Sequence, residues 1–354
     1  MWCRWCSLGT AGIVLSGVLS ILAGFCFNAN LEVQKLSESF PTSDALAELG
    51  ISTFQRPSDG GNIEWFQYGA KDDSSEIWVI IHGAVSTGGV LEIFPDFDQR
   101  MRDLNVRVIA PTMPGWGTSD GYGPLFEITN HKWLENWRKD AMDLVNFLKI
   151  DKFWVSGMSL GGPPALALAE AAQSEHRLLG VATLISSMWS HDDFDPIKVA
   201  NHTPFERFAL SILVNPYLGA VAAQLLQFFL LGSSKEDFLA SPMVPDDVCW
   251  DRETWGLDMQ RSVRYQLFGQ VQSNRLVALS SPTDAPLIDW STFTEEIPMY
   301  LFYGETDDTV KPVIATFPAS KLHWAKRMPF PGGHLDLDIF AVANSLFASQ
   351  NKMP

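Results

Sequence analysis

The sequence predicts an α/β fold: a mostly parallel, doubly wound sheet with helices on both faces and a helical cap inserted late in the chain. Short stretches rich in β-branched and aromatic residues alternate with stretches that carry apolar residues at helical spacing. Strands and helices in alternation favour a parallel sheet whose two faces are both covered. The chain has 354 residues, 46% of them hydrophobic, which is enough for one large core.

Seven stretches read as strands and four as helices. The predicted strands are residues 62–69, 76–83, 106–117 (running into a Pro/Gly-rich loop), 152–157, 178–187, 298–304 and 321–330. The predicted helices are a stretch around 90–103, then 131–148, 166–172 and a closing helix from residue 335 onward. Residues 131–148 show the clearest helical periodicity, with apolar side chains recurring from Trp133 to Leu148.

The regular alternation breaks between two predicted core strands, where a long and mostly helical pattern intervenes. We therefore expect five segments: a signal peptide or membrane anchor (1–30), a linker (31–50), a first core part (51–188), a helical cap (189–297) and a second core part (298–354).

The N-terminal segment is apolar enough to direct export. Residues 8–27 are 20 residues without a charged side chain, close to the roughly 20 residues that cross a bilayer core. Arg4 precedes this segment and Glu32 follows it, which places the N-terminus in the cytoplasm and the remaining chain outside. A cleaved signal peptide and an uncleaved anchor both fit. We expect an exported protein that is either secreted or attached to the membrane through residues 8–27.

Charge and motif content exclude several function classes. The formal net charge is −16, with 41 acidic against 25 basic residues, so a nucleic acid would be repelled and no nucleic-acid partner is expected. No cluster of His, Cys and carboxylate residues has metal-ligand spacing. The glycines of residues 115–121 miss the spacing of a dinucleotide-binding loop. We therefore expect neither a metal nor a cofactor.

Ser159 is the candidate nucleophile. It stands in Gly157-Met158-Ser159-Leu160-Gly161, a G-x-S-x-G motif between a predicted strand and a predicted helix. A serine displayed on so tight a turn needs neighbours without side chains, because a Cβ there would collide with the backbone. The helix that follows points its N-terminal amides at developing negative charge.

A serine hydroxyl needs a base, and the base needs an orienting acid. His334 follows the last predicted strand in "PFPGGHLDLD", whereas His323 lies inside a strand pattern and is expected to pack there. Asp307 follows the strand at 298–304, and its neighbour Asp308 is a rival for the same role. The spacing G-x-x-D-x-x-V, with Gly304 and Val310, favours Asp307.

The oxyanion site is expected at the end of the strand at 76–83. His82 and Gly83 end that strand, and the backbone amides of Ala84 and Leu160 are the candidate donors to a developing oxyanion. His82 itself is expected to be structural rather than catalytic.

Together these motifs resemble the α/β-hydrolase superfamily. The resemblance rests on H-G at residues 82–83, P-G-x-G-x-S at 114–119, G-x-S-x-G-G at 157–162, G-x-x-D-x-x-V at 304–310 and G-G-H at 332–334. It covers residues 50–350 approximately and follows the chain order serine, aspartate, histidine. It implies an eight-stranded, mostly parallel sheet with a helical cap after the sixth strand. A serine at this position implies acyl chemistry, as in esterases, lipases, thioesterases, amidases, C–C bond hydrolases or cofactor-free perhydrolases.

The expected function is hydrolysis of a carboxylic ester through an acyl-enzyme, with a small, hydrophobic or lipid-like ester as substrate. Residues 208–232 of the cap carry no charge; they fit an apolar pocket and equally fit simple packing of the cap on the core. A single membrane crossing there would put Ser159 and His334 on opposite sides of the bilayer, so we interpret it as cap helices. The alternative from another class is a catalytically silent binding or receptor protein that keeps the fold.

Overall fold

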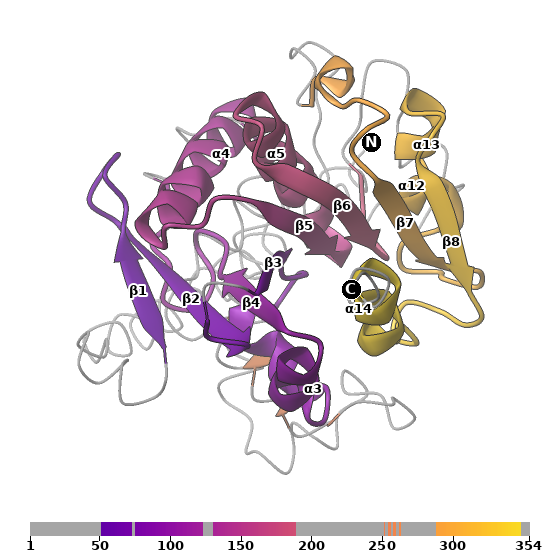
Figure 1. The fold of residues 1–354 in the computed structure, drawn as a ribbon, viewed down its shortest axis with the longest axis horizontal. Coiled ribbons are helices and arrows are strands. Elements are labelled where there is room, and N and C mark those ends of the chain that lie inside the picture. The colour runs from indigo at the N-terminus through magenta and orange to yellow at the C-terminus, as the bar shows by residue number, and fades with distance from the viewer. Residues whose placement is uncertain are drawn as a thin grey trace, which may run out of the picture.

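The computed structural model describes residues 51–72, 75–122, 130–188, 251, 254–255, 258–259, 262 and 288–347 (Figure 1). The described part is built on one sheet of eight strands in the order β1-β2-β4-β3-β5-β6-β7-β8. The expected leader and linker, and most of the expected cap, lie outside the described residues.

Neighbouring strands are parallel from β4 through β3, β5, β6 and β7 to β8, and the two antiparallel pairs are β1–β2 and β2–β4. The strands are β1 (Ser52–Gln55), β2 (Asn62–Gly69), β3 (Glu76–Ile81), β4 (Val106–Pro111), β5 (Phe153–Met158), β6 (Leu178–Leu184), β7 (Met299–Gly304) and β8 (Lys326–Phe330). The predicted mostly parallel, eight-stranded sheet is therefore confirmed.

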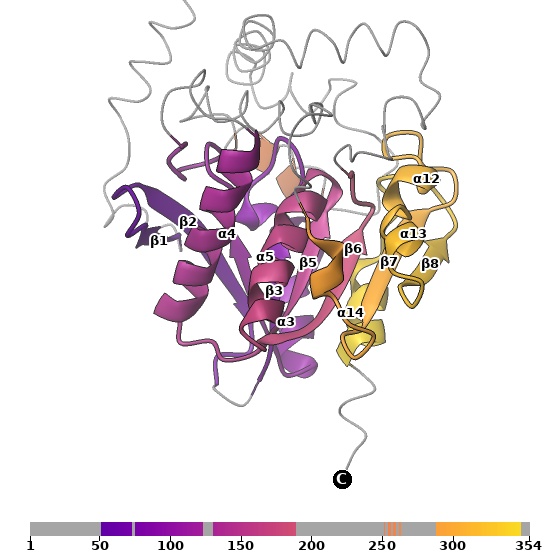
Figure 2. The ribbon, with the colours of Figure 1, turned by 90° about the horizontal axis from the view of Figure 1, so that it is seen from above.

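Helices cover both faces of the sheet, as Figures 1 and 2 show, with α4 and α5 on one face and α3 and α14 on the other. The helices are η1 (Gly88–Ile93), α3 (Phe97–Asp103), α4 (Asn130–Phe147), η2 (Ser159–Gly161), α5 (Gly162–Ser174), η3 (Trp290–Thr292), α12 (Pro312–Ala315), α13 (Pro318–Lys321) and α14 (Ile339–Phe347). The doubly wound arrangement is that expected from the alternating pattern.

The central strand β3 shows why the sequence folds this way. Val79 and Ile81 belong to the core under α4 and α5, while Trp78 and Ile80 belong to the core under α3 and α14. All four side chains are at most 1% exposed. Successive side chains of a strand point to opposite faces, so a strand buried on both faces needs an unbroken apolar run.

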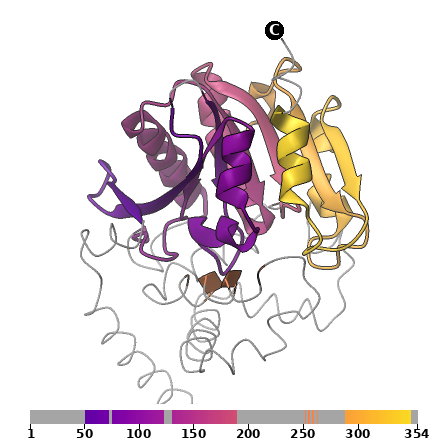
Figure 3. The ribbon, with the colours of Figure 1, turned by 60° about the horizontal axis from the view of Figure 1, so that its bottom comes forward.

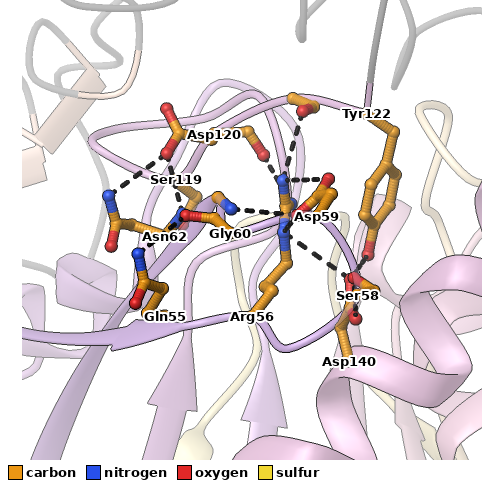
Figure 4. Close-up of polar contacts among 12 residues, drawn as sticks. Gln55, Arg56, Ser58, Asp59, Gly60, Asn62, Ser119, Asp120, Tyr122 and Asp140 are labelled. Carbon is orange, nitrogen blue, oxygen red and sulfur yellow. Dashed lines mark hydrogen bonds and ion pairs between the residues drawn. The ribbon is translucent and has the colours of Figure 1, made fainter.

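A buried polar network fastens the β1–β2 hairpin to the rest of the core (Figure 4). Arg56 is 1% exposed and donates two hydrogen bonds of 2.9 Å to the carboxylate of Asp59 and one of 2.7 Å to the carbonyl oxygen of Asp120. Its guanidinium lies 4.6 Å from the ring centre of Tyr122, whose hydroxyl donates to Asp140 on α4. Burial raises the pKa of both Tyr122 and Asp140. The network therefore links the hairpin, the loop after β4 and α4.

The predicted strand at 321–330 is wrong in its first half. Lys321 ends α13 and β8 begins only at Lys326. The side chain of His323 is 80% exposed and its Nε2 lies 3.1 Å from Glu295 Oε1, so the prediction that His323 packs inside a strand is also wrong. Pro318 suits the first turn of α13, which reaches Lys321, and residues 322–325 form a turn before the strand begins.

Two further elements differ from the sequence prediction. The helix predicted around 90–103 is divided into η1 and α3, because Asp96 between them has a left-handed φ of 60°. Strand β1 was not predicted, since four residues are too short to show a period.

Across the described ranges, every helix is too short or too polar to cross a bilayer. Residues 8–27 and 208–232, the two apolar segments of the sequence, lie outside those ranges.

Candidate active site

Ser159 stands on a strained turn at the end of a central strand. It follows β5 directly and begins η2, which leads into α5. Its φ is 48°, in the left-handed region that residues with a side chain rarely adopt. A Cβ added to Gly157 would collide with the carbonyl oxygen of Gly161, and one added to Gly161 would collide with that of His82. The two glycines are therefore required for the turn to close.

Three side chains from three different loops form one chain of hydrogen bonds. The hydroxyl of Ser159 donates to His334 Nε2 over 3.0 Å, and His334 Nδ1 donates to Asp307 Oδ2 over 2.8 Å. His334 thus lies within hydrogen-bond reach of both Ser159 and Asp307, the arrangement expected of a candidate nucleophile, base and acid. Ser159 and His334 are 175 residues apart in the sequence.

The carboxylate that contacts His334 is that of Asp307, while Asp308 is exposed to solvent. Asp307 is 2% exposed, and its Oδ1 accepts hydrogen bonds of 2.8 Å from the amides of Thr309 and Val310. These two amides fix the carboxylate and leave Oδ2 for the imidazole.

The loop that carries His334 is held against the loop of Asp307. The amide of Thr306 donates to the carbonyl oxygen of Gly332 over 3.0 Å, and the amide of Gly333 donates to Asp336 Oδ2 over 2.6 Å. Gly332 has a φ of 114°, which only glycine adopts readily. The position of His334 is therefore fixed by its own loop as well as by Asp307.

The loop expected to donate to an oxyanion lies next to Ser159. A Cβ added to Gly83 would lie 3.2 Å from Ser159 Cβ, so this loop passes close to the serine. Ala84 follows Gly83, and Leu160 follows Ser159 and is buried. The two candidate amides thus belong to residues that adjoin Gly83 and the nucleophile.

His82 lies behind this loop and is separate from the hydrogen-bonded triad. The amide of Met113 donates to its Nε2 over 2.8 Å, and its Nδ1 donates to the carbonyl oxygen of Gly83 over 2.7 Å. These two contacts require a neutral ring with its proton on Nδ1. The ring is 1% exposed, and burial lowers the pKa of His82 to about 4.

The hydrogen bond from His82 to the Gly83 carbonyl also orients the amide of the candidate donor Ala84. The carbonyl oxygen of Gly83 and the amide of Ala84 belong to one trans peptide, in which C=O and N–H point in opposite directions. Fixing the carbonyl therefore also fixes the direction of the amide.

Sequence reasoning missed Asp258, which reaches the loop after Ala84 from the interval between β6 and β7. It is 6% exposed and accepts hydrogen bonds from Ser86 and Thr87. One aspartate within "GLDMQ" carries no motif, so the sequence offered no signal for it.

Within the described ranges, no group of three or more His, Cys, Asp or Glu side chains could hold a metal ion. The chemistry that the geometry offers is proton transfer between His334 and Ser159, with Asp307 orienting the imidazole.

Several solved structures share this fold. A carboxylesterase from the thaumarchaeon Nitrososphaera gargenis has a TM-score of 0.56 and 14% identity, over 85% of this chain and 99% of that one. An esterase from Rhodococcus sp. has a TM-score of 0.56 and 15% identity over the same shares of the two chains. A bromoperoxidase from Bacillus anthracis has a TM-score of 0.55 and 17% identity, over 84% of this chain and 99% of that one. At these identities the likeness establishes the fold alone.

Searching curated protein sequences gave no significant match. The sequence model of the alpha/beta hydrolase family, in contrast, matches residues 78–341, from within β3 to beyond β8, and this range includes all three residues of the hydrogen-bonded triad. The chain belongs to the alpha/beta hydrolase family.

Proposed function

We propose that the protein is a serine hydrolase that cleaves carboxylic esters through an acyl-enzyme intermediate. The observation that carries the proposal is the chain of hydrogen bonds from Ser159 Oγ through His334 to Asp307, with distances of 3.0 and 2.8 Å. A serine is a poor nucleophile until a base takes its proton, and His334 Nε2 is placed to do so.

In the acylation step, Ser159 Oγ attacks the ester carbonyl carbon while its proton moves to His334 Nε2. Asp307 stabilises the imidazolium that forms, because its carboxylate accepts a hydrogen bond from Nδ1–H. The amides of Ala84 and Leu160 donate to the oxyanion of the tetrahedral intermediate. His334 then gives its proton to the departing alkoxide, so the alcohol leaves and the acyl group stays on Ser159.

The deacylation step repeats the same proton transfers with water. His334 takes a proton from a water molecule as its oxygen attacks the acyl carbon, and the second tetrahedral intermediate collapses. Ser159 Oγ receives the proton back and the free acid leaves. One ester and one water are consumed, and one acid and one alcohol are released.

A hydrophobic or lipid-like acyl group is the proposed substrate class. The uncharged run at residues 208–232 in the expected cap supports this class, since substrate pockets are lined mainly by apolar side chains. A series of p-nitrophenyl esters from acetate to palmitate measures this preference. A kcat/KM that rises with acyl length supports the proposal, and a maximum at acetate contradicts it.

Covalent labelling with a fluorophosphonate tests the hydrolase proposal. The folded wild type is expected to be labelled on Ser159, and S159A is expected to stay unlabelled. The matched control is S174A, which removes an exposed hydroxyl at the other end of α5 and should label like the wild type. Folded wild type that does not react with the probe would contradict the proposal.

We also propose that residues 8–27 direct export, as an anchor or as a cleaved signal. These residues carry no charged side chain, and their number is close to that needed to cross a bilayer core. Expression of the full chain followed by alkaline extraction of membranes separates the two outcomes. Pelleting with the membranes supports an anchor, release of a shortened chain supports cleavage, and a full-length chain in the cytosol contradicts both.

A further inference from the structure

Asp258 places a buried carboxylate against the loop that carries the candidate oxyanion donor. It belongs to the interval between β6 and β7, and its side chain accepts hydrogen bonds on both oxygens. Ser86 Oγ donates to Oδ2 over 2.8 Å, the amide of Thr87 donates to Oδ2 over 3.2 Å, and Thr87 Oγ1 donates to Oδ1 over 2.5 Å. Ser86 and Thr87 are themselves at most 4% exposed. The contact is therefore desolvated on both sides.

This contact has the strength to hold a backbone in place. A buried carboxylate is costly unless hydrogen bonds replace its water, and hydrogen bonds to a carboxylate are stronger than those between neutral groups. Three of them converge here from two successive residues. Thr87 Oγ1 also accepts a hydrogen bond of 3.0 Å from the amide of Gly89, so the contact extends into η1.

The loop held in this way is under strain. Val85 lies between Ala84 and Ser86 and has a φ of 50°, which is rare for a β-branched residue. Strained backbone of this kind persists only where the surroundings hold it. His82 holds the loop on one side of Val85, at the Gly83 carbonyl, and Asp258 holds it on the other side.

The neighbours of Asp258 are fastened to the same end of the core. The amide of Asp251 donates to the carbonyl oxygen of Ile93, at the end of η1, over 2.9 Å. The amide of Gly117 donates to the carbonyl oxygen of Ser262 over 3.0 Å. Figure 3 shows these short pieces, at the colour of residues 251–262 in the bar, beside the purple turn that contains η1. Asp258 thus lies between two backbone attachments.

We infer that Asp258 is a positioning residue for the oxyanion loop, residues 83–87. The segment inserted between β6 and β7 then supplies part of the catalytic machinery instead of only covering it: its carboxylate holds Ser86 and Thr87, and through them the strained Val85 and the amide of Ala84. The inference rests on the proposed hydrolase function.

The test compares D258N with D251N in the full-length protein. Both replace an aspartate of the same segment by its neutral isostere, and the Asp251 carboxylate accepts a hydrogen bond of 2.7 Å from Thr254 Oγ1 within that segment. Three quantities are measured: kcat per fluorophosphonate-titrated site, KM for p-nitrophenyl butyrate, and the affinity for a trifluoromethyl ketone. The ketone forms a hemiketal whose oxyanion needs the same amides.

D258N is expected to lower kcat at least tenfold, to leave KM within threefold, and to weaken ketone binding by a factor similar to the loss in kcat. Loss of one oxyanion donor lowers kcat by about 10²–10³, and a displaced loop is expected to lose part of that. D251N should match the wild type. A role in docking alone would lower the melting temperature of D258N and leave kcat per titrated site and ketone affinity unchanged, which would overturn the inference.

A second variant decides the matter if D258N does not fold. S86A removes one of the three donors and creates no unpaired charge, so its kcat and ketone affinity should fall together by about three- to tenfold. Unchanged values in S86A would also overturn the inference. The wild type shows which of the two proposals fails. If Ser159 of the wild type is not labelled, both the hydrolase function and the role of Asp258 are contradicted. If the wild type is labelled and active, and D258N and S86A have the same kcat and ketone affinity, only the role of Asp258 is contradicted.

Discussion

His82 is expected to make the protein less stable as the pH falls from 7 to 4, and replacing it by glutamine should remove this part of the pH dependence. Burial lowers the pKa of His82 from 6.5 to about 4 in the folded chain, while the unfolded chain keeps the ordinary value. Between these two values the unfolded chain binds a proton that the folded chain does not. Lower pH therefore favours unfolding in this window, and the stability contributed by the neutral ring is fully present only above pH 6.5.

The magnitude follows from the two pKa values. Each unit of difference between the folded and unfolded pKa of His82 corresponds to about 1.4 kcal/mol, so the loss of stability is about 2 kcal/mol at pH 5 and about 3 kcal/mol once the pH is below 4. Such a loss is a large part of a typical stability of about 5–15 kcal/mol. Glutamine is neutral at every pH and offers both a donor and an acceptor, so H82Q should lack this slope.

The assay is urea unfolding of wild type and H82Q at pH 7.5, 6 and 5. Burial raises the pKa of Asp140 and Glu170, which affects the slope in the opposite direction, but it does so in both proteins. The difference in unfolding free energy between the two proteins therefore isolates His82. It should change by about 2 kcal/mol between pH 7.5 and 5. An unchanged difference, or an NMR titration of His82 near pH 6.5, would refute the reasoning.

Three other substitutions test the geometry. D307N should lower kcat by about 10³–10⁴, because the amide cannot stabilise the imidazolium in the required tautomer, whereas D308N should retain most of the activity; both are measured on p-nitrophenyl butyrate. G83A should lower kcat at least tenfold while the far-UV circular dichroism stays that of the wild type, because the new Cβ lies 3.2 Å from Ser159 Cβ at the site of the expected oxyanion donors. R56M should lower the unfolding free energy in urea by about 3 kcal/mol, because it leaves the buried Asp140 without its cation.

Each of these expectations has an outcome that contradicts it. Equal losses in D307N and D308N would mean that the acid is not Asp307. Full activity in G83A would remove the reason given for a glycine beside the nucleophile. Arg102 pairs with Asp98 on the surface of α3 and has a side chain 43% exposed, so R102M is the control for R56M and should change the stability little. A loss in R56M no larger than that in R102M would contradict the assigned role of the network.

Much of the fold could be predicted because its elements leave a period in the sequence. Strands buried on both faces are continuous apolar runs, as in "EIWVII" of β3, and α4 repeats apolar residues at helical spacing. Strand β1 has only four residues, and the one local signal was the turn "PSDGG" before β2. The error at 321–330 lies at residues 321–325, where α13 ends and a turn follows. Leu322, Trp324 and Ala325 in this turn are apolar, and so few residues show no period that differs from that of a strand.

Some residues of the candidate site could also be predicted from local motifs, and others could not. Ser159, Asp307 and His334 lie in local motifs fixed by glycines, and those motifs have a recognisable spacing. The role of His82 depends on the amide of Met113 and the carbonyl of Gly83, which come together only when β3 and β4 pair. Asp258 has no local pattern, and its partners are 171 and 172 residues away. Contacts of this kind depend on tertiary structure that a single sequence does not reveal.

The most direct test of the central claim is to trap the acyl-enzyme. Turnover of a p-nitrophenyl ester is stopped with acid within the first turnovers, and the protein is digested and analysed by mass spectrometry. We expect the mass of the acyl group on the peptide that contains Ser159, and neither adduct nor turnover in S159A. Turnover by the wild type with the acyl group on another residue, or persistent turnover in S159A, would contradict the account.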